Sequence, residues 1–172
     1  KPVRIISDTK GGYYVFTLDV SNSFATAVYR VSEKFEVKYS VDDFSDMSGD
    51  PENICINPEG NLLVIFKDAD TDTYFINEIN SENGKVSERY EREFDDNAYL
   101  TGNLFNSVGQ TSEKYDFYIS KKDGIYGYDL KTDSSEKVFI NSSEKSPDCI
   151  FIENDNMLIY NSQAGNDDFA VC

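Results

Sequence analysis

The chain has 172 residues, with 32 Asp and Glu against 16 Lys and Arg, and therefore a formal net charge of −16. This balance excludes nucleic acid as a partner, because phosphate binding needs clustered basic residues and here they are few and scattered. The chain has no His, which removes the commonest general base and every histidine-based triad. No apolar run approaches the roughly 20 residues of a membrane span, so we expect none.

Short apolar or alternating runs, bounded by Gly, Asn, Asp and Ser, follow one another along the whole chain, and helical periodicity is nearly absent. In chain order the pattern predicts strands at 3–7, 13–18, 26–32, 35–41, 53–57, 62–66, 73–79, 86–90, 103–108, 115–119, 124–130, 137–140, 148–152, 157–160 and 168–172. The sequence therefore predicts an all-β protein.

The predicted strands recur as a unit of four. The second strands of the units begin at residues 13, 62, 115 and 157, a period of about 40 to 50 residues that is typical of β-propeller blades. We predict a single domain over 1–172, a β-propeller or propeller-like arc of about four four-stranded antiparallel blades. The repeat units are approximately 1–50, 51–98, 99–143 and 144–172, and the last blade is incomplete.

The three cysteines form neither a disulfide framework nor a metal-binding spacing. Cys55 and Cys149 take equivalent first-strand positions in two different units, so we do not expect them to be bonded to each other. With Cys172 they are predicted to be three free thiols. The chain opens at Lys1 without a Met or signal peptide and stops abruptly. We expect a longer natural chain whose targeting segment has been removed.

Two sets of segments carry a resemblance to known families. The turn Ile79-Asn80-Ser81-Glu82-Asn83-Gly84-Lys85-Val86 is similar to the strand–turn–strand of quinoprotein-type propeller repeats. A second set resembles the propeller-like N-terminal region of extracellular solute-binding lipoproteins of Gram-positive gut bacteria: Gly11-Gly12-Tyr13-Tyr14-Val15, Tyr115-Asp116-Phe117-Tyr118-Ile119 and Gly124-Ile125-Tyr126-Gly127-Tyr128-Asp129.

This resemblance implies a noncatalytic binding or scaffold module at the bacterial cell surface, in a protein that captures carbohydrates or peptides. It also implies a transporter-binding domain elsewhere in the protein. The chain has no Trp at the quinoprotein docking position and no complete cofactor site, so no cofactor is expected.

An acidic loop is the one candidate metal site. Asp68, Asp70 and Asp72 alternate in a hairpin loop, an arrangement in which carboxylate oxygens can converge on Ca²⁺. An EF-hand needs Gly at its sixth position and Glu at its twelfth, but here these positions hold Thr73 and Ile79. The alternatives are a weak Ca²⁺ site and a solvated acidic turn.

The acidic clusters at 42–46 and 91–96 provide the alternative function, a propeller-based glycoside hydrolase or lyase that uses an Asp/Glu pair. Such a pair needs a fixed separation and one protonated member, which neighbouring loop acids do not supply. No Gly-x-Ser-x-Gly or Ser-x-x-Lys motif is present. We therefore expect no enzyme.

Tyrosines provide the remaining candidates, because aromatic side chains both stack on sugar rings or peptides and pack between sheets. They bracket the predicted inner strands: Tyr13, Tyr14, Tyr115, Tyr118, Tyr126, Tyr128 and Tyr160. The expected partners are a carbohydrate or peptide ligand or another protein domain. An open arc would also leave bare strand edges, which favours edge-to-edge self-association.

Overall fold

The structure is a computed structural model of the chain. It describes residues 2–8, 10–19, 25–42, 44, 51–68, 70–71, 73–94, 99–101, 114–121, 123–140, 149–153, 156–163 and 166–171. These residues form strands and turns and contain no helix. The strands are β1 (Pro2–Asp8), β2 (Gly12–Asp19), β3 (Ala25–Ser32), β4 (Val37–Val41), β5 (Asn53–Ile56), β6 (Leu62–Lys67), β7 (Thr73–Ile79), β8 (Val86–Glu93), β9 (Tyr99–Thr101), β10 (Phe117–Lys121), β11 (Gly124–Asp129), β12 (Ser134–Ile140), β13 (Cys149–Glu153), β14 (Asn156–Gln163) and β15 (Asn166–Val171).

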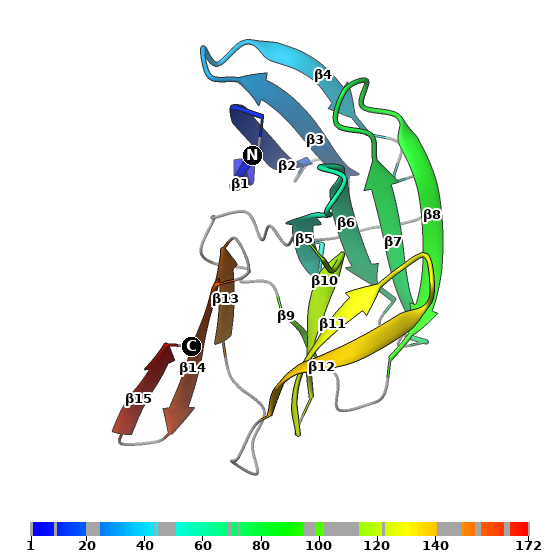
Figure 1. Ribbon diagram of the computed structural model, residues 1–172. Helices are drawn as coiled ribbons and strands as arrows, with labels where there is room; N and C mark the ends of the chain where they lie inside the picture. The colour runs from blue at the N-terminus through cyan, green and yellow to red at the C-terminus, as the bar shows by residue number, and fades with distance from the viewer. Residues whose placement is uncertain are drawn as a thin grey trace.

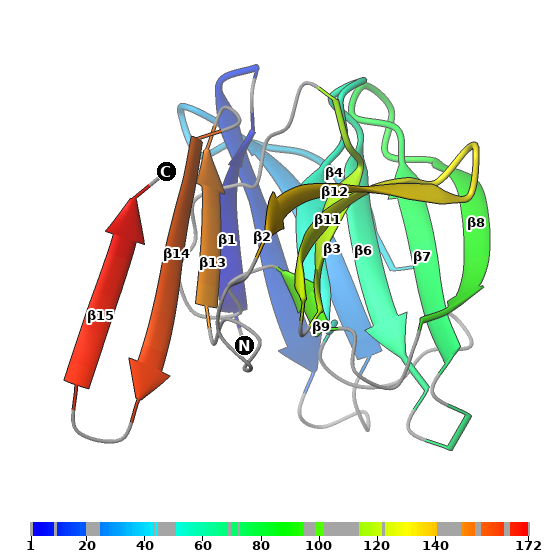
Figure 2. The same ribbon diagram turned by 60° about the horizontal axis from the view of Figure 1, so that its bottom comes forward.

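The strands form antiparallel sheets in which sequence neighbours pair. Sheet 1 contains β1–β4, sheet 2 contains β5–β8, sheet 3 contains β9–β12, and sheet 4 contains the three strands β13–β15. Sheets 1, 2 and 3 follow one another around an arc, and sheet 4 comes after sheet 3 (Figure 1). Strand β15 lies at the free end of sheet 4, away from the other sheets (Figure 2). The prediction of an all-β protein with antiparallel sheets is confirmed.

Most predicted strands match observed ones, and the differences lie at their ends. Strand β4 begins at Val37 instead of residue 35, because Phe35 has a φ of 61° and belongs to a turn. Strand β10 begins at Phe117 instead of residue 115. The predicted strand at 103–108 lies outside the described residues, and sheet 3 begins with β9. Alternation identifies which residues share a face, but it does not fix where a strand bends into its turn.

Sheets 1 and 2 share a core cluster. Sheet 1 contributes mainly Ile6, Tyr14, Phe16 and Val28, and sheet 2 contributes Ile54, Ile56, Leu62, Val64, Phe66 and Ile79. Alternate residues of sheet 2 point the other way and pack against sheet 3 in a second cluster: Cys55, Leu63, Ile65, Tyr74 and Ile76 with Phe117, Ile119, Tyr128 and Leu130. Sheet 2 is therefore covered on both faces, which explains the nearly continuous apolar sequences of β5 and β6.

The outermost strand of sheet 2, β8, is an edge strand with the sequence VSERYERE, and most of its side chains are half-buried or exposed. Charged side chains on an edge oppose pairing with another chain. The pairing of β8 with β7 contains a bulge between Glu78 and Ile79, and the pairing of β4 with β3 contains one between Arg30 and Val31. The described residues form no helix long and apolar enough to cross a membrane.

Candidate functional site

Sheets 1 and 2 correspond residue by residue. Tyr13 pairs with Ser7 and Val31 in sheet 1, as Leu62 pairs with Ile56 and Ile79 in sheet 2. The bulges extend the match to the outer strands, where Val37 corresponds to Val86. On the next row, Ile5 and Val15 correspond to Ile54 and Val64. In sheet 2, these residues face sheet 1. Their counterparts in sheet 1 therefore lie on the face of sheet 1 that is turned away from sheet 2.

This face of sheet 1 is covered less completely than the corresponding face of sheet 2. Ile5 is 48% exposed, whereas its counterpart Ile54 is 6% exposed. Val37 is 61% exposed, while Val86 is half-buried and packs against the core shared by sheets 1 and 2. We define the open face of sheet 1 by four apolar residues that are exposed or half-buried: Ile5, Tyr13, Val15 and Val37. An apolar face of this kind is where a partner molecule would be expected to bind.

Three positions on this side of sheet 1 have hydroxyl side chains where sheet 2 has hydrocarbon. Ser7, Tyr13 and Thr17 correspond to Ile56, Leu62 and Phe66. The Thr17 hydroxyl donates a hydrogen bond to the Ala27 carbonyl oxygen, with 3.3 Å between the oxygens. Hydroxyl groups lower the cost of contact with water, so this face is suited to a surface that is covered only part of the time.

At the end of this face, the turn between β3 and β4 presents an aromatic side chain. The Phe35 amide donates to the Ser32 carbonyl oxygen at 2.8 Å, and the Ser32 amide donates to the Glu36 carbonyl oxygen at 2.9 Å. Phe35 occupies the left-handed position of the turn, which is unusual for a bulky residue and costs about 1–2 kcal/mol. In the matching turn of sheet 2, Gly84 takes the left-handed conformation without that cost, with a φ of 71°.

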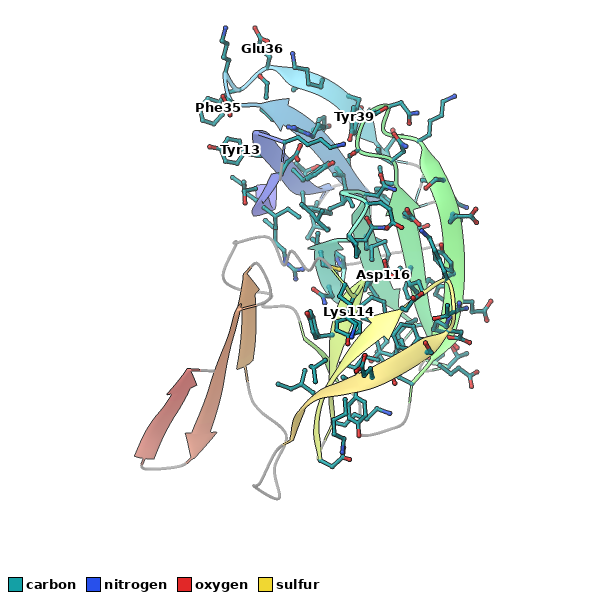
Figure 3. The ribbon with its side chains drawn as sticks, viewed as in Figure 1. Tyr13, Phe35, Glu36, Tyr39, Lys114 and Asp116 are labelled. Carbon is teal, nitrogen blue, oxygen red and sulfur yellow. The ribbon has the colours of Figure 1, made fainter. Side chains whose placement is uncertain are left out.

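The Phe35 side chain is 78% exposed, so core packing does not explain its conformation. Its ring stacks on the ring of Tyr13, with 5.8 Å between centroids and an interplanar angle of 5°. Figure 3 shows the two labelled rings side by side at one end of sheet 1, with Glu36 next to Phe35 in the same turn. One face of the Phe35 ring contacts Tyr13, and most of the side chain remains accessible to a ligand.

A buried polar cluster holds this end of sheet 1 in place. Arg30 forms an ion pair with Asp8, and both side chains are nearly buried. The Arg30 guanidinium also donates to the carbonyl oxygens of Gly11 and Val31, and lies 5.4 Å from the Tyr14 ring centroid. Burial, followed by the interaction with Tyr39, raises the pKa of Tyr14 far above its usual range. Tyr14 is therefore a neutral structural phenol at all physiological pH values.

The turn between β7 and β8 packs against sheet 1. A Cβ atom on Gly84 would lie 2.4 Å from the Tyr39 ring, so the ring needs a glycine there. The Tyr39 hydroxyl donates to the Ser81 carbonyl oxygen at 3.1 Å, and the Lys10 ammonium donates to the Ser81 hydroxyl at 3.1 Å. The turn of sheet 2 is thus fastened to sheet 1, whereas the turn of sheet 1 presents Phe35 to solvent.

The acidic loop predicted as a Ca²⁺ site is only partly described, because Asp72 lies outside the described residues. One carboxylate oxygen of Asp68 accepts the backbone amides of Asp70 at 2.8 Å and Thr71 at 3.3 Å. These bonds stabilise the turn itself. Among the described residues, no three His, Cys, Asp or Glu side chains gather closely enough to hold a metal ion. The calcium site stays a prediction.

Two buried acids lie at the junction of sheets 2 and 3. Glu78 accepts hydrogen bonds from the side-chain amides of Asn57 and Asn61 and from the Tyr90 hydroxyl. Asp116 accepts the Leu130 amide at 2.7 Å, and its pKa is raised mainly by burial. Both carboxylates are thus held by the fold, which favours structural roles for them.

A surface groove of about 690 Å³ runs between β4 and β8. It is lined by Ser40, Val41, Asp42, Gly84, Lys85, Val86, Ser87, Glu88 and Arg89. None of these side chains is aromatic, so the groove lacks the stacking surface that characterises the end of sheet 1.

The candidate tyrosines have different roles. Tyr14, Tyr115, Tyr118 and Tyr128 are buried, and the side chain of Tyr160 is not among those described. Tyr126 is half-buried and lies between the ammonium groups of Lys121 and Lys137, each 5.2 Å from its ring centroid. Packing therefore accounts for most of them. Tyr13 is the candidate that joins an exposed aromatic surface.

The sequence did not single out Phe35, which was predicted to begin a strand. A signal was present, because Glu33-Lys34-Phe35-Glu36 is a polar turn with one large aromatic residue in it. The open face was not foreseen either. Its pattern of apolar residues is the pattern of a covered face, and the sequence does not show which faces have a partner.

No protein-family model matches the chain, and no curated protein matches it. Among solved structures, it is similar to the extracellular domain of BT4673 from B. thetaiotaomicron, a protein named as a one-component system. The sequence identity is 18% and the TM-score is 0.48. The match covers 90% of this chain and 18% of that one, so the chain spans less than a fifth of the length of this neighbour.

Proposed function

We propose that the chain is a noncatalytic binding or scaffold module, in which the open face of sheet 1 and the adjoining Phe35 form the contact surface for a partner molecule. One observation carries the proposal. Phe35 adopts a strained backbone conformation and exposes most of an aromatic side chain to solvent, both at a cost to stability. Features that cost stability at the surface are typical of binding sites.

The propeller arrangement and the cell-surface location belong to the same proposal. The arc of sheets with sequential strands supports the first. The sequence resemblance to solute-binding lipoproteins supports the second. Under this proposal the candidate ligands are carbohydrates, which stack their C–H faces on aromatic rings, and peptides, which place apolar side chains on them.

Direct binding measurements on the purified chain test the proposal. Glycan and peptide arrays should identify a ligand, and titration calorimetry should then show that Phe35→Ala weakens binding at least tenfold. Val138→Ala, at a 39% exposed site on the outer strand of sheet 3, serves as the matched control and should leave affinity unchanged. Binding that survives Phe35→Ala would overturn the assignment of the site. Hydrolysis of a bound sugar would overturn the noncatalytic proposal.

A further inference from the structure

The position-by-position match between sheets 1 and 2 indicates what kind of surface the open face is suited to meet. In sheet 2 the matching residues, among them Ile54, Leu62 and Val64, are buried against an apolar face of a neighbouring β-sheet. Packed sheets bring alternate side chains of two strand layers together about 10 Å apart. Ile5, Tyr13 and Val15 occupy the same positions, so the open face is built to pack against a sheet.

We propose that the open face binds a second copy of this chain, sheet 1 against sheet 1, in a symmetric dimer. This inference rests on the proposed function and names the partner of its contact surface. A two-fold interface uses one patch twice, so the patch must be self-complementary. The open face meets this condition because its four residues are apolar or, at Tyr13, aromatic, and none is charged.

The distribution of charge supports this choice of partner. Residues 2–42, which contain sheet 1, carry five Lys or Arg and five Asp or Glu, although the whole chain has a net charge of −16. Residues 53–93, which contain sheet 2, carry four basic and nine acidic residues. Since sheet 2 packs on the other side of sheet 1, docking through the open face brings the neutral parts of two copies together and keeps the acidic parts apart.

Exposed apolar side chains also concentrate here. Among the residues whose side-chain exposure the structure describes, which do not include those of sheet 4, the large hydrophobic side chains that are exposed are Ile5, Phe35, Val37 and Val138. The first three lie on sheet 1 or its β3–β4 turn, and only Val138 lies elsewhere. Among these side chains, the best apolar counterpart for an open face is therefore the open face of another copy.

The size of the face predicts a weak, reversible dimer. Strands of about seven residues and four strands at about 4.8 Å spacing give a face of roughly 500 Å², or about 1,000 Å² for two copies. This is near the lower limit for a specific interface, which corresponds to dissociation constants of about micromolar or weaker. The hydroxyl groups of Ser7, Tyr13 and Thr17 can bond to water, which is consistent with a surface that is exposed to solvent in the free monomer.

Sedimentation equilibrium of the whole chain, from about 1 μM to 1 mM, tests the proposal. We expect the mass to rise from 19.5 kDa toward twice that value. Dimerisation should strengthen as salt is raised, because salt screens the repulsion between two acidic molecules. Val37→Lys should weaken the dimer at least tenfold, whereas Val138→Lys, the same change on an outer strand of sheet 3, should alter it less than twofold. Circular dichroism confirms that both variants fold.

Each other outcome contradicts the dimer. A monomer at every concentration overturns it, as does a dimer that Val37→Lys leaves intact. A monomer in which Ile5 and Val37 are protected from carbene labelling means that another part of the same chain covers the face. A monomer that binds a glycan through Phe35 keeps the proposed function and removes only this inference.

Discussion

The open face of sheet 1 and the corresponding face of sheet 2 have the same strand register, the same bulge and similar apolar positions, yet one is partly exposed and the other is core. Ile5 and Ile54 show the difference most directly, at 48% and 6% exposure. The backbone frame therefore does not decide which face is buried. The presence of a neighbouring sheet decides it. The side chains differ accordingly, because sheet 1 has Thr17 and Tyr13 where the covered face has Phe66 and Leu62.

The turns at the ends of these two faces also differ in whether they are covered by a neighbouring sheet. In sheet 2, Gly84 lets the Tyr39 ring of sheet 1 approach the turn backbone. In sheet 1, Phe35 occupies the matching left-handed position and stacks on Tyr13 of its own sheet. A covered turn needs a residue without a side chain, and an open one can present a ring. The following predictions test how far this difference extends.

The largest expected effect comes from the same substitution at the two matched isoleucines. Ile54→Ala leaves a cavity in the core between sheets 1 and 2 and should lower the free energy of unfolding by about 2–5 kcal/mol. Ile5→Ala removes a half-exposed side chain and should cost less than about 1 kcal/mol in the monomer. Urea unfolding at low protein concentration measures both. Equal losses would mean that the open face is covered in solution.

The next effect comes from exchanging the turn residues. Gly84→Phe forces a side chain into the Tyr39 ring and into a left-handed conformation, so it should cost about 2–4 kcal/mol. Phe35→Gly relieves backbone strain, but it removes the stacking on Tyr13 and increases the conformational entropy of the unfolded chain. The free energy of unfolding should therefore stay within about 1 kcal/mol of the parent value. Thermal and urea unfolding report both values. A large loss for Phe35→Gly would make Phe35 a structural residue.

A smaller, pH-dependent effect is expected at the covered junction of sheets 2 and 3, which contains a buried carboxylate where the open face has none. Burial raises the pKa of Asp116 in the folded state above its unfolded value of about 3.9. The folded state then binds more protons between the two pKa values. The contribution of Asp116 to stability is therefore fully present below the unfolded pKa, and it is lost as pH rises through the folded pKa.

The variant Asp116→Asn keeps an acceptor for the Leu130 amide and removes the titration. Its stability relative to the parent should increase as pH is raised from about 4 to 7. Asp129→Asn is the control, because hydrogen bonds from the backbone amides, first that of Thr132, lower the pKa of Asp129 and place its titration below this pH range. The stability that Asp129 contributes is present above its unfolded pKa of about 3.9, so the relative stability of this variant should stay nearly constant from about pH 4 to 7 and should rise as pH falls below that range. Urea unfolding as a function of pH measures both, and a flat curve for Asp116→Asn would contradict the assignment.

The smallest structural effect is expected for the thiol of Cys55, which lies on the covered face between sheets 2 and 3. Burial raises its pKa far above the usual range, and the side chain is fully buried. We expect no reaction of Cys55 with iodoacetamide in the native protein and full reaction in urea, measured by mass spectrometry of its peptide. Rapid native labelling would show that the junction opens.

Much of the fold could be predicted from the sequence, because alternation and turn residues mark strands directly. The covered strands β5 and β6 and the burial of Cys55 follow from local runs of apolar residues. The start of β4 could not be predicted, since an aromatic residue such as Phe35 favours a strand by propensity, and only the turn hydrogen bonds place it in the left-handed region. The exposure of Ile5 could not be predicted because it depends on what lies opposite.

The matching bulges in sheets 1 and 2 have a consequence for protein engineering. Each bulge falls at the same step of the third hairpin, between Arg30 and Val31 in one sheet and between Glu78 and Ile79 in the other. The two outer hairpins therefore share the register of their strands, although the turn of sheet 2 is one residue longer, and the left-handed turn position holds Phe35 in sheet 1 and Gly84 in sheet 2. The turn of sheet 1 is a position at which a grafted side chain would be exposed to solvent. The turn of sheet 2 is a position at which the chain packs against a neighbouring sheet.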